Sequence, residues 1–437
     1  GSSRPDVVEL SLQLPLTIDY IAGPTQATPP AGFAQWYPLQ VPDEIPPSSV
    51  WSARDWLEAP AGKHGRILRA GDALFYDGKP IKLWGVNTSF AYNAPQKEIA
   101  DRRADFYAAL GINTVRMHKY ADGPAWAGIQ SEYSAEEFDP EKLDRMDYYV
   151  AALKERGIYV KLSPVFITKL GRDDLDAVPY MSEFGTVPTK PNQRLSPKHG
   201  SFYLSTELQD LLIRQVTKLL DHRNPYTGLR YADDPAVAYV ELFNEDSSLF
   251  YGTARQIAQS PTLRKRSAAR FYDWLVQRYG SQAAAARAWG GSSINPDFLP
   301  GTLRDESWEE RRVYPYGDPY LFDPDTLSGP QKNHRVRILD TMTFLYDLQN
   351  EVYDRYAAAI REAGYTGELV ASNWRAGRSY SHLLNLHSDA RFGTIDRHNY
   401  FGGNNRNLFY YKNASMLSQP GSGILSSGLQ QVANHPF

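Results

Sequence analysis

The sequence predicts a parallel α/β fold, which we interpret as a (β/α)8 TIM barrel. From about residue 81 onward, short apolar strand patterns alternate with amphipathic helical patterns, and strands separated by helices must pair in parallel. Polar side chains gather at the C-terminal ends of the predicted strands, where barrels carry their active sites. No glycine-rich phosphate turn follows the first strand, which argues against a nucleotide-binding, doubly wound sheet.

Six strands are predicted from apolar runs, starting near residues 81, 112, 158, 236, 368 and 393. The dipeptide Asp77-Gly78, which favours tight hairpin turns, indicates a small hairpin that leads into the first of these strands. Residues 1–64 are rich in proline and predict an N-terminal extension or a small β layer. Residues 65–437 then hold the first six βα units, and we expect strands 7 and 8 beyond residue 437.

Helices are predicted where apolar stripes lie between start and stop signals. Asp139 with Pro140, and Ser205, are the expected N-terminal caps, and glycines end several stripes. The predicted helical ranges are about 99–110, 140–153, 206–219, 265–289 and 335–363. Two long loops, about 167–204 and 291–333, follow predicted strand ends or helices and are expected to wall a cleft. Their aspartate-rich pieces lack the spacing of a calcium-binding loop, so we expect solvated carboxylates there.

The composition excludes several classes of function. A net charge of -3 gives no basic surface for nucleic acid, and the absence of cysteine excludes thiol chemistry. No apolar run approaches the ~20 residues that cross a membrane. The chain is rich in aromatic residues, with 29 Tyr, 18 Phe and 9 Trp, which suit either a tyrosine-rich core or stacking on sugar rings.

The stretch AYVELFNEDSS carries the strongest chemical signal, because a buried-strand pattern ends in Asn244-Glu245. A glutamate at a barrel mouth that is partly shielded from water can have the raised pKa that a general acid needs. The other candidates are polar and aromatic side chains at or just beyond strand ends: Asn87, Arg116, His118, Trp126, Trp374, His398 and Tyr400. No zinc or acyl-hydrolase motif is present, so neither a metal nor a cofactor is expected.

Several of the candidates have a structural alternative. Arg116 and Glu241 could form a buried ion pair inside the barrel, and His118 could be a hydrogen-bonded core histidine. Trp126 and Trp374 could pack against the protein instead of against a sugar. These alternatives stay open at the level of sequence.

Residues 81–437 resemble the retaining glycoside hydrolases of clan A. The resemblance rests on four strand motifs, WGVN, GINTVRMH, DDPAVAYVELFNED and DRHNY, which occur in the expected order. The segment FYDWLVQRYGSQAAAARAWG is also similar to family 42 β-galactosidases, and the barrel pattern is similar to family 5 enzymes.

The resemblance implies a retaining β-glycosidase that hydrolyses a polysaccharide or oligosaccharide. Glu245 would be the general acid/base, Asn244 would bind the sugar 2-hydroxyl, and Arg116 would support the catalytic carboxylates. His398 and Tyr400 would line the reactive subsite. The expected partner is a carbohydrate substrate, and a secreted or periplasmic location is favoured. The alternative is a carbohydrate-binding pseudoenzyme that has lost hydrolysis.

The nucleophile is missing from the recognised motifs. Retaining enzymes hold two carboxyl groups about 5–5.5 Å apart. Glu241 has the right strand parity but should lie roughly 13 Å below Glu245, at ~3.3 Å per residue. Asp246 and Asp396 are also poorly placed. The resemblance therefore implies a nucleophilic glutamate on strand 7, beyond residue 437, in a further part of the same protein or on a separate chain.

Overall fold

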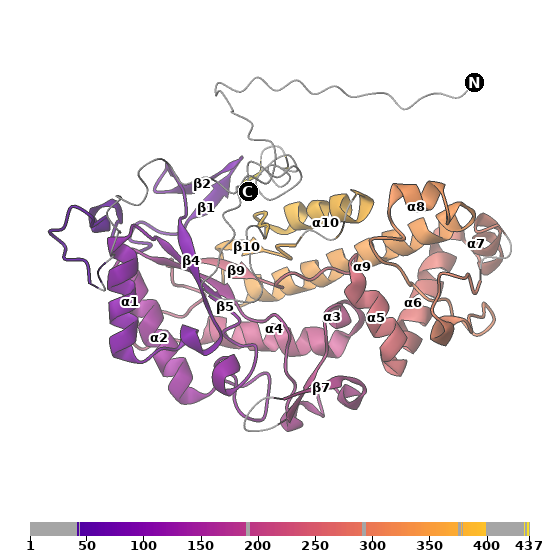
Figure 1. The fold of residues 1–437 in the computed structure, drawn as a ribbon, viewed down its shortest axis with the longest axis horizontal. Coiled ribbons are helices and arrows are strands. Elements are labelled where there is room, and N and C mark those ends of the chain that lie inside the picture. The colour runs from indigo at the N-terminus through magenta and orange to yellow at the C-terminus, as the bar shows by residue number, and fades with distance from the viewer. Residues whose placement is uncertain are drawn as a thin grey trace, which may run out of the picture. The chain divides into compact units, whose positions relative to one another are not determined.

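Five parallel strands form the central sheet of the protein, seen in the computed structural model (Figure 1). The model describes residues 42 and 44–398 apart from 189–192, 291–293, 375–376 and 378, together with 432, 435 and 436. The strands are β4 (Gly85–Ser89), β5 (Thr114–His118), β6 (Tyr159–Ser163), β9 (Val237–Glu241) and β10 (Glu368–Val370). Their spatial order is β10-β9-β6-β5-β4, so the predicted parallel α/β architecture is confirmed.

The strand order follows the chain without reversal. Each new strand is added at the same edge of the sheet, next to the strand before it. This order is typical of a barrel, whereas the strand order of a doubly wound sheet reverses at a switch point. Beyond β10, the Thr394 N–H donates to Leu369 O at 2.9 Å and the His398 N–H donates to Asn373 O at 3.2 Å. The segment 394–398 therefore lies beside β10, in the sixth place. Closure into a barrel stays a prediction.

Two strand predictions need correction. The first strand starts at Gly85 and not at residue 81, because Lys79–Ile81 pairs instead as β3 with β2 (Ala73–Tyr76) in the predicted hairpin. Asp77 and Gly78 have φ values of 48° and 71° and form its turn. The sixth predicted strand is not formed as a strand over residues 394–398, because the two hydrogen bonds at the ends of this segment do not make a ladder.

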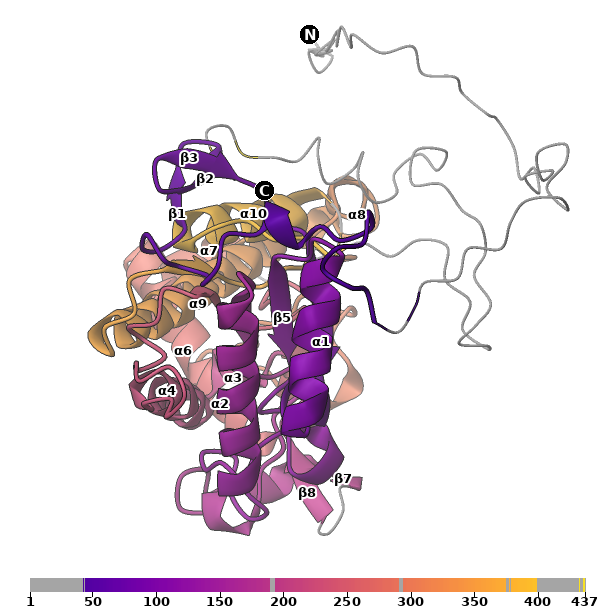
Figure 2. The ribbon, with the colours of Figure 1, turned by 90° about the vertical axis from the view of Figure 1, so that its left-hand side faces the viewer.

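Helices separate most of the strands along the chain. They are α1 (Lys97–Ala109), α2 (Pro140–Glu155), α4 (Thr206–Asp221), α5 (Tyr251–Gln259), α6 (Pro261–Tyr279), α7 (Gln282–Ala288), α9 (Arg335–Glu362) and α10 (Ser379–Phe392). Helix α1 lies beside α2 (Figure 2), and α9 lies between α4 and α10 (Figure 1). Asp139 and Ser205 cap α2 and α4 as predicted, each accepting a backbone N–H at 3.1 Å. The single helix predicted over 265–289 is instead two, because Gly280 takes the left-handed conformation (φ 79°).

The two predicted loops contain ordered structure. Residues 167–204 include the hairpin β7 (Gly185–Pro188) and β8 (Gln193–Ser196) and the short helix α3 (Ser201–Leu204). Residues 291–333 include α8 (Pro324–Ser328). Asp174 accepts hydrogen bonds from the Ser134 hydroxyl and from the backbone N–H groups of Ala135 and Gly171. Asp323 caps α8. These two aspartates therefore stabilise the loops.

The N-terminal end of the sheet is closed by apolar packing. Ala61 and Ile67 join Tyr159, Ala236 and Val370 in a buried cluster, with the hairpin side chains packed against it. The Ala61 N–H donates to Lys154 O of α2 at 2.8 Å. The polar strand ends therefore lie at the opposite end of the sheet. The division between residues 1–64 and 65–437 stays a prediction, and residues 1–41 lie outside the described part.

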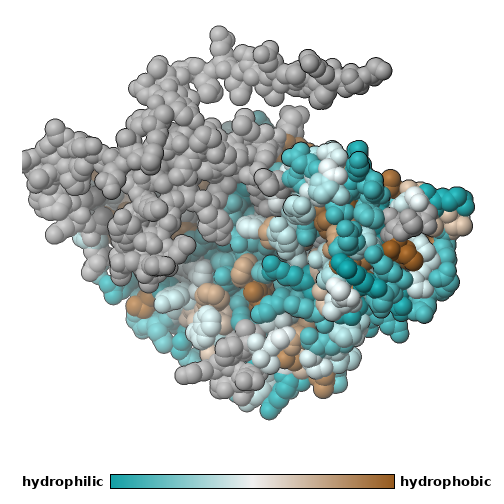
Figure 3. Space-filling view, turned by 45° about the vertical axis from the view of Figure 1, so that its right-hand side comes forward, coloured by the Kyte–Doolittle hydropathy of each residue, from teal (hydrophilic) through white to brown (hydrophobic). Residues whose placement is uncertain are grey.

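The surface shown in Figure 3 is mostly hydrophilic, with apolar side chains in small separate groups. None of the helices in the described part of the chain is both long and apolar enough to cross a membrane.

The second of the two long loops, residues 291–333, is called here the second insertion, and a buried ion pair fixes it to α9. Glu306 accepts two hydrogen bonds from Arg337, at 2.6 and 2.7 Å, and backbone N–H groups of Asn295 and Tyr314 at 3.0 and 2.7 Å. Both charged side chains are almost fully buried, at 1% and 0% exposed. Removing one partner of such a pair leaves a buried charge without its counter-ion.

We expect Glu306→Ala to lower the free energy of unfolding by about 3–5 kcal/mol, measured by urea denaturation. The control is Glu351→Ala, because Glu351 pairs with Arg270 on the surface and its side chain is 65% exposed. The control should change the free energy by less than about 1 kcal/mol. Equal effects of the two substitutions would contradict a structural role for the Glu306 pair.

Candidate active site

A polar cluster lies at the C-terminal ends of the strands, on one face of the sheet. In the register of the parallel ladders, Asn87 of β4 lies opposite Arg116 of β5, which lies opposite Lys161 of β6. Residues opposite each other on neighbouring strands point to the same face. Three strands therefore bring one amide and two cations together.

Glu241, at the end of β9, is the anion that binds these cations. Arg116 donates to both carboxylate oxygens, from Nε at 2.9 Å and from Nη2 at 2.6 Å. Lys161 Nζ lies 3.0 Å from Oε2, and the Ser163 hydroxyl donates to Oε1 at 2.6 Å. Burial alone would raise the pKa of Glu241, but the charges of Lys161 and Arg116 hold it well below its ordinary value. Glu241 is therefore an ionised structural carboxylate.

Arg116 and Glu241 thus form the buried ion pair that the sequence left open. Arg116 also contacts two of the candidate site residues, Asn244 and Asn87. Its Nη2 donates to Asn244 Oδ1 at 2.8 Å and its Nη1 lies 3.5 Å from Asn87 Oδ1. Burial would lower the pKa of Arg116, and Glu241 raises it above its ordinary value. Arg116 therefore carries a permanent charge beside Asn244.

Lys161 is a site residue that the sequence reasoning missed. It forms ion pairs with both Glu241 and Asp396, and it connects the segment after α10 to β6. Burial would raise the pKa of Asp396, but Lys161 and His398 lower it. A single lysine in the apolar strand YVKLS was the available signal, because a charge in a buried strand needs a partner.

Glu245 leaves the sheet in a left-handed conformation, with φ of 50°. Its N–H donates to Ser372 O at 2.9 Å and to Asn373 Oδ1 at 3.0 Å. Its Oε1 lies 2.6 Å from Nδ1 of His398, and its side chain is 13% exposed. The structure thus brings Glu245, Asn244 and His398 together.

Backbone strain concentrates at these strand ends. Four non-glycine residues with positive φ follow four different strands of the sheet: Phe90, Lys119, Glu245 and Asn373. Such conformations cost about 1–3 kcal/mol each and are typical of functional sites.

His118 has the contacts of a structural histidine. Its Nδ1 lies 2.9 Å from the Ser163 hydroxyl, and the residue is 9% exposed. Burial, with the nearby Arg116 charge, lowers the pKa of His118 to about 3, so its ring is neutral at ordinary pH. The predicted sugar contact of His118 stays a prediction.

The aromatic candidates flank this cluster. Trp126 is 56% exposed and packs edge-on against Phe90, with ring centroids 5.1 Å apart. Trp374 is half-buried and packs edge-on against Phe250, at 5.5 Å. Their roles in sugar binding stay predictions. Tyr400 lies outside the described residues.

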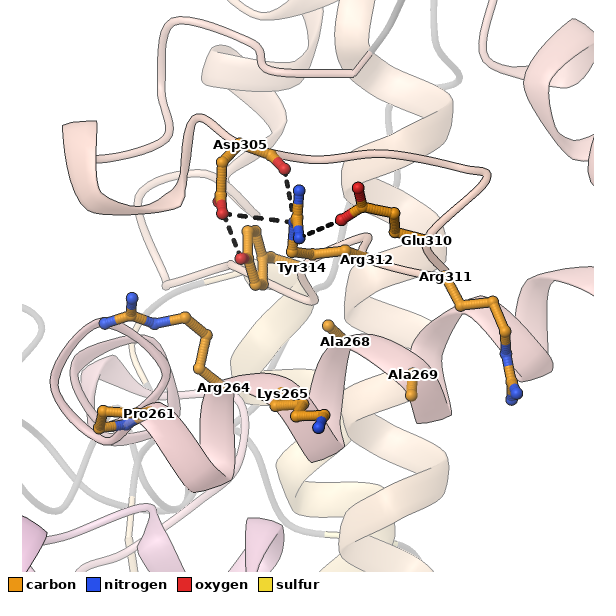
Figure 4. A pocket seen from close by; sticks show the side chains of 10 residues that line it. All are labelled: Pro261, Arg264, Lys265, Ala268, Ala269, Asp305, Glu310, Arg311, Arg312 and Tyr314. Atoms are coloured by element: carbon orange, nitrogen blue, oxygen red, sulfur yellow. Dashed lines mark hydrogen bonds and ion pairs between the residues drawn. The ribbon is translucent and has the colours of Figure 1, made fainter.

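A separate cavity of about 510 Å³ lies between α6 and the second insertion (Figure 4). Its lining carries four cationic side chains and two anionic ones. Arg312 pairs with both anions, Asp305 and Glu310, and Tyr314 donates to Asp305 at 2.8 Å. None of the candidate residues lines this cavity. Within the described residues, no group of three or more His, Cys, Asp or Glu side chains is arranged to hold a metal ion.

We expect the low pKa of His118 to make stability depend on pH. In the unfolded chain the His118 ring binds a proton as the pH falls below about 6.5, whereas in the folded protein it stays neutral down to about pH 3. The contribution of His118 to the free energy of unfolding is therefore complete above about pH 6.5 and is lost as the pH is lowered toward about 3. Between about pH 6.5 and about pH 5, the free energy of unfolding should fall by about 2 kcal/mol more in the wild type than in His118→Gln.

Urea denaturation across this pH range measures the difference. The control is His387→Gln, since His387 is exposed and contacts the Tyr346 hydroxyl. Its pH dependence should match that of the wild type. Parallel curves for His118→Gln and the wild type would show that His118 is protonated in the folded state.

The chain is similar to plant enzymes that act on mannan. It is 26% identical over 183 residues to "Mannan endo-1,4-beta-mannosidase 2" of Oryza sativa subsp. japonica, over 41% of this chain and 39% of that protein. It is 24% identical over 200 residues to "Mannan endo-1,4-beta-mannosidase 5" of Arabidopsis thaliana, over 44% of each chain. No protein-family model matches.

Among solved structures, a β-galactosidase from the psychrophilic Marinomonas ef1 is 21% identical. The match covers 71% of this chain and 40% of that chain, with a TM-score of 0.43. The chain spans about two fifths of the length of the curated relatives that it matches. The similarity is therefore to a part of proteins named as mannan endo-1,4-beta-mannosidases.

Proposed function

We propose that the protein is a retaining β-glycosidase that hydrolyses O-glycosidic bonds of a polysaccharide or oligosaccharide. The observation that carries the proposal is the placement of Glu245. Its side chain follows the C-terminal end of β9, next to Asn244, is 13% exposed, and is hydrogen-bonded to His398 through the carboxyl group. This is the edge of a parallel α/β fold at which catalytic groups gather.

In the proposed reaction, Glu245 acts twice. It first donates a proton to the glycosidic oxygen as the bond to the anomeric carbon breaks, and it later removes a proton from the attacking water. Between the two steps a second carboxylate holds the sugar in a covalent bond. His398 lies within hydrogen-bond distance of the Glu245 carboxyl, so it can orient this group for both proton transfers.

The second carboxylate is not assigned to Glu241 or Asp396. Glu241 is bound by Arg116 and Lys161, and Asp396 is bound by Lys161, so each is neutralised by a buried cation. A carboxylate that must attack carbon needs a lone pair directed at the sugar. We therefore keep the proposal of a glutamate on a seventh strand as the nucleophile.

The substrate-binding roles follow from the chemistry of the neighbouring groups. Arg116 donates to Asn244 Oδ1 and so orients this amide, which leaves Nδ2 directed away from Arg116 toward a sugar hydroxyl. Trp126 and Trp374 offer flat faces for sugar rings, and Tyr400 is proposed beside the nucleophile. The curated relatives are named for β-1,4-mannan, so this polysaccharide is the first to test.

A carbohydrate-binding pseudoenzyme is the second candidate. It is favoured by the observation that Glu241 and Asp396, the carboxylates that bind the same cation cluster, are both neutralised by it. Such a protein would bind the polysaccharide without releasing sugars.

We expect Glu245→Gln to reduce hydrolysis of mannan oligosaccharides by about 10²–10⁴-fold, because the amide cannot donate the proton that the leaving oxygen needs. The measurement is release of reducing sugar by the full-length protein. Glu351→Gln, on the exposed face of α9, is the control and should leave the rate unchanged.

Hydrolysis that Glu245→Gln leaves intact would contradict the proposed role of Glu245. Binding of mannan by the wild type without any release of sugar, measured by calorimetry on the same samples, would support the pseudoenzyme.

A further inference from the structure

Asn373, the residue that follows the end of β10 by three positions, binds Glu245 and His398 through different atoms. Its Oδ1 accepts the Glu245 N–H at 3.0 Å, and its main-chain carbonyl accepts the His398 N–H at 3.2 Å. The His398 ring in turn lies 2.6 Å from the Glu245 carboxyl. The three residues therefore form a closed ring of hydrogen bonds around the proposed acid/base.

The orientation of the Asn373 amide is fixed by this ring. The Glu245 N–H is a donor, so the amide must present its oxygen to Glu245 and its Nδ2 elsewhere. Asn373 is 1% exposed, and its Nδ2 has no hydrogen-bond partner within the described residues. A buried donor without a partner lowers the free energy of unfolding by about 1–3 kcal/mol. The left-handed backbone of Asn373 (φ 41°) is a second unfavourable feature of the same residue.

The segment after β10 that carries Asn373 is hydrogen-bonded to helix α10. Asn385 of α10 donates from Nδ2 to Trp374 O at 2.8 Å and to the Ser372 hydroxyl at 3.2 Å. The Ser372 hydroxyl donates to Asp389, and Arg397 also donates to Asp389, at 2.9 and 2.7 Å. All of these side chains except that of Arg397 belong to residues that are at most 2% exposed. Ser372 also accepts the Glu245 N–H through its main-chain O, at 2.9 Å, whereas the hydrogen bonds of Asn385, Asp389 and Arg397 named here do not reach Glu245.

We propose that Asn373 is a positioning residue for proton donation by Glu245, an inference that rests on the proposed function. Its side chain holds the backbone of Glu245 in the strained conformation that directs the carboxyl group toward the substrate, and its carbonyl holds His398 against that carboxyl. Proton transfer requires the donor within about 2.6–3.2 Å of the glycosidic oxygen, so a small displacement of Glu245 is costly.

The test compares two substrates that differ in their need for a proton donor. A mannan oligosaccharide has an alkoxide leaving group that must be protonated, whereas a dinitrophenyl β-mannoside leaves without protonation. The variant is Asn373→Gly, because glycine adopts positive φ freely and the substitution removes the amide without adding backbone strain. We expect kcat/KM to fall about 10–100-fold on the oligosaccharide and less than about 3-fold on the dinitrophenyl substrate.

Asn385→Ala is the matched control, since it removes a buried amide from the same network but not a ligand of Glu245. Any loss it causes should be equal on the two substrates. An equal loss for Asn373→Gly on both substrates would overturn the inference, because it would indicate a general structural or substrate-binding role.

Glu245→Gln, measured on the same pair of substrates, separates this failure from failure of the proposed function. If Glu245→Gln retains full activity on the oligosaccharide, the proposed function fails. If it loses activity there while Asn373→Gly does not, only the role of Asn373 is wrong.

Discussion

The buried carboxylate of Glu241 is the interaction on which the arrangement of the strand ends depends. It forms ion pairs with two cations, Arg116 and Lys161, whose side chains are 11% and 10% exposed, and Asp396 is the second anion of the cluster. A buried charge without a partner would destabilise the protein by several kcal/mol. A shift of one residue in the register of β5, β6 or β9 would turn a charged side chain to the other face of the sheet. The ion cluster therefore selects one register for three strands at once.

Glu241 and Glu245, four residues apart at the end of β9, have different environments. Glu241 lies inside the sheet, is fully buried and is held ionised by its cations. Glu245 follows a left-handed turn out of the strand and contacts a histidine. One carboxylate thus stabilises the fold, and the other is the one for which we propose proton transfer. The difference arises from position along the strand, because four residues separate the interior of the sheet from its edge.

Stability elsewhere in the molecule supports the strained edge. Strained residues persist only when the surrounding structure determines their conformation. Here the opposite end of the sheet is closed by an apolar cluster, and α10 supports the end of β10 through Asn385 and Asp389. The loop 291–333 is fixed to α9 by the buried Glu306–Arg337 pair.

The sequence by itself determined the alternation of strands and helices, the hairpin at Asp77-Gly78 and the caps at Asp139 and Ser205. These features depend on residues close together in the chain, so local propensity and periodicity reveal them. It also indicated that Asn244 and Glu245 end a buried strand. It failed where local signals compete, as in the single helix predicted across Gly280.

Only the tertiary structure decided what the candidate side chains contact. Arg116 lies 125 residues from Glu241, and Lys161 lies 235 residues from Asp396. Asn373 lies 128 residues from Glu245. Such pairs are set by strand order and register, which no local pattern contains. The sequence could therefore place charges and amides at strand ends, but only the folded sheet brings each one to its partner.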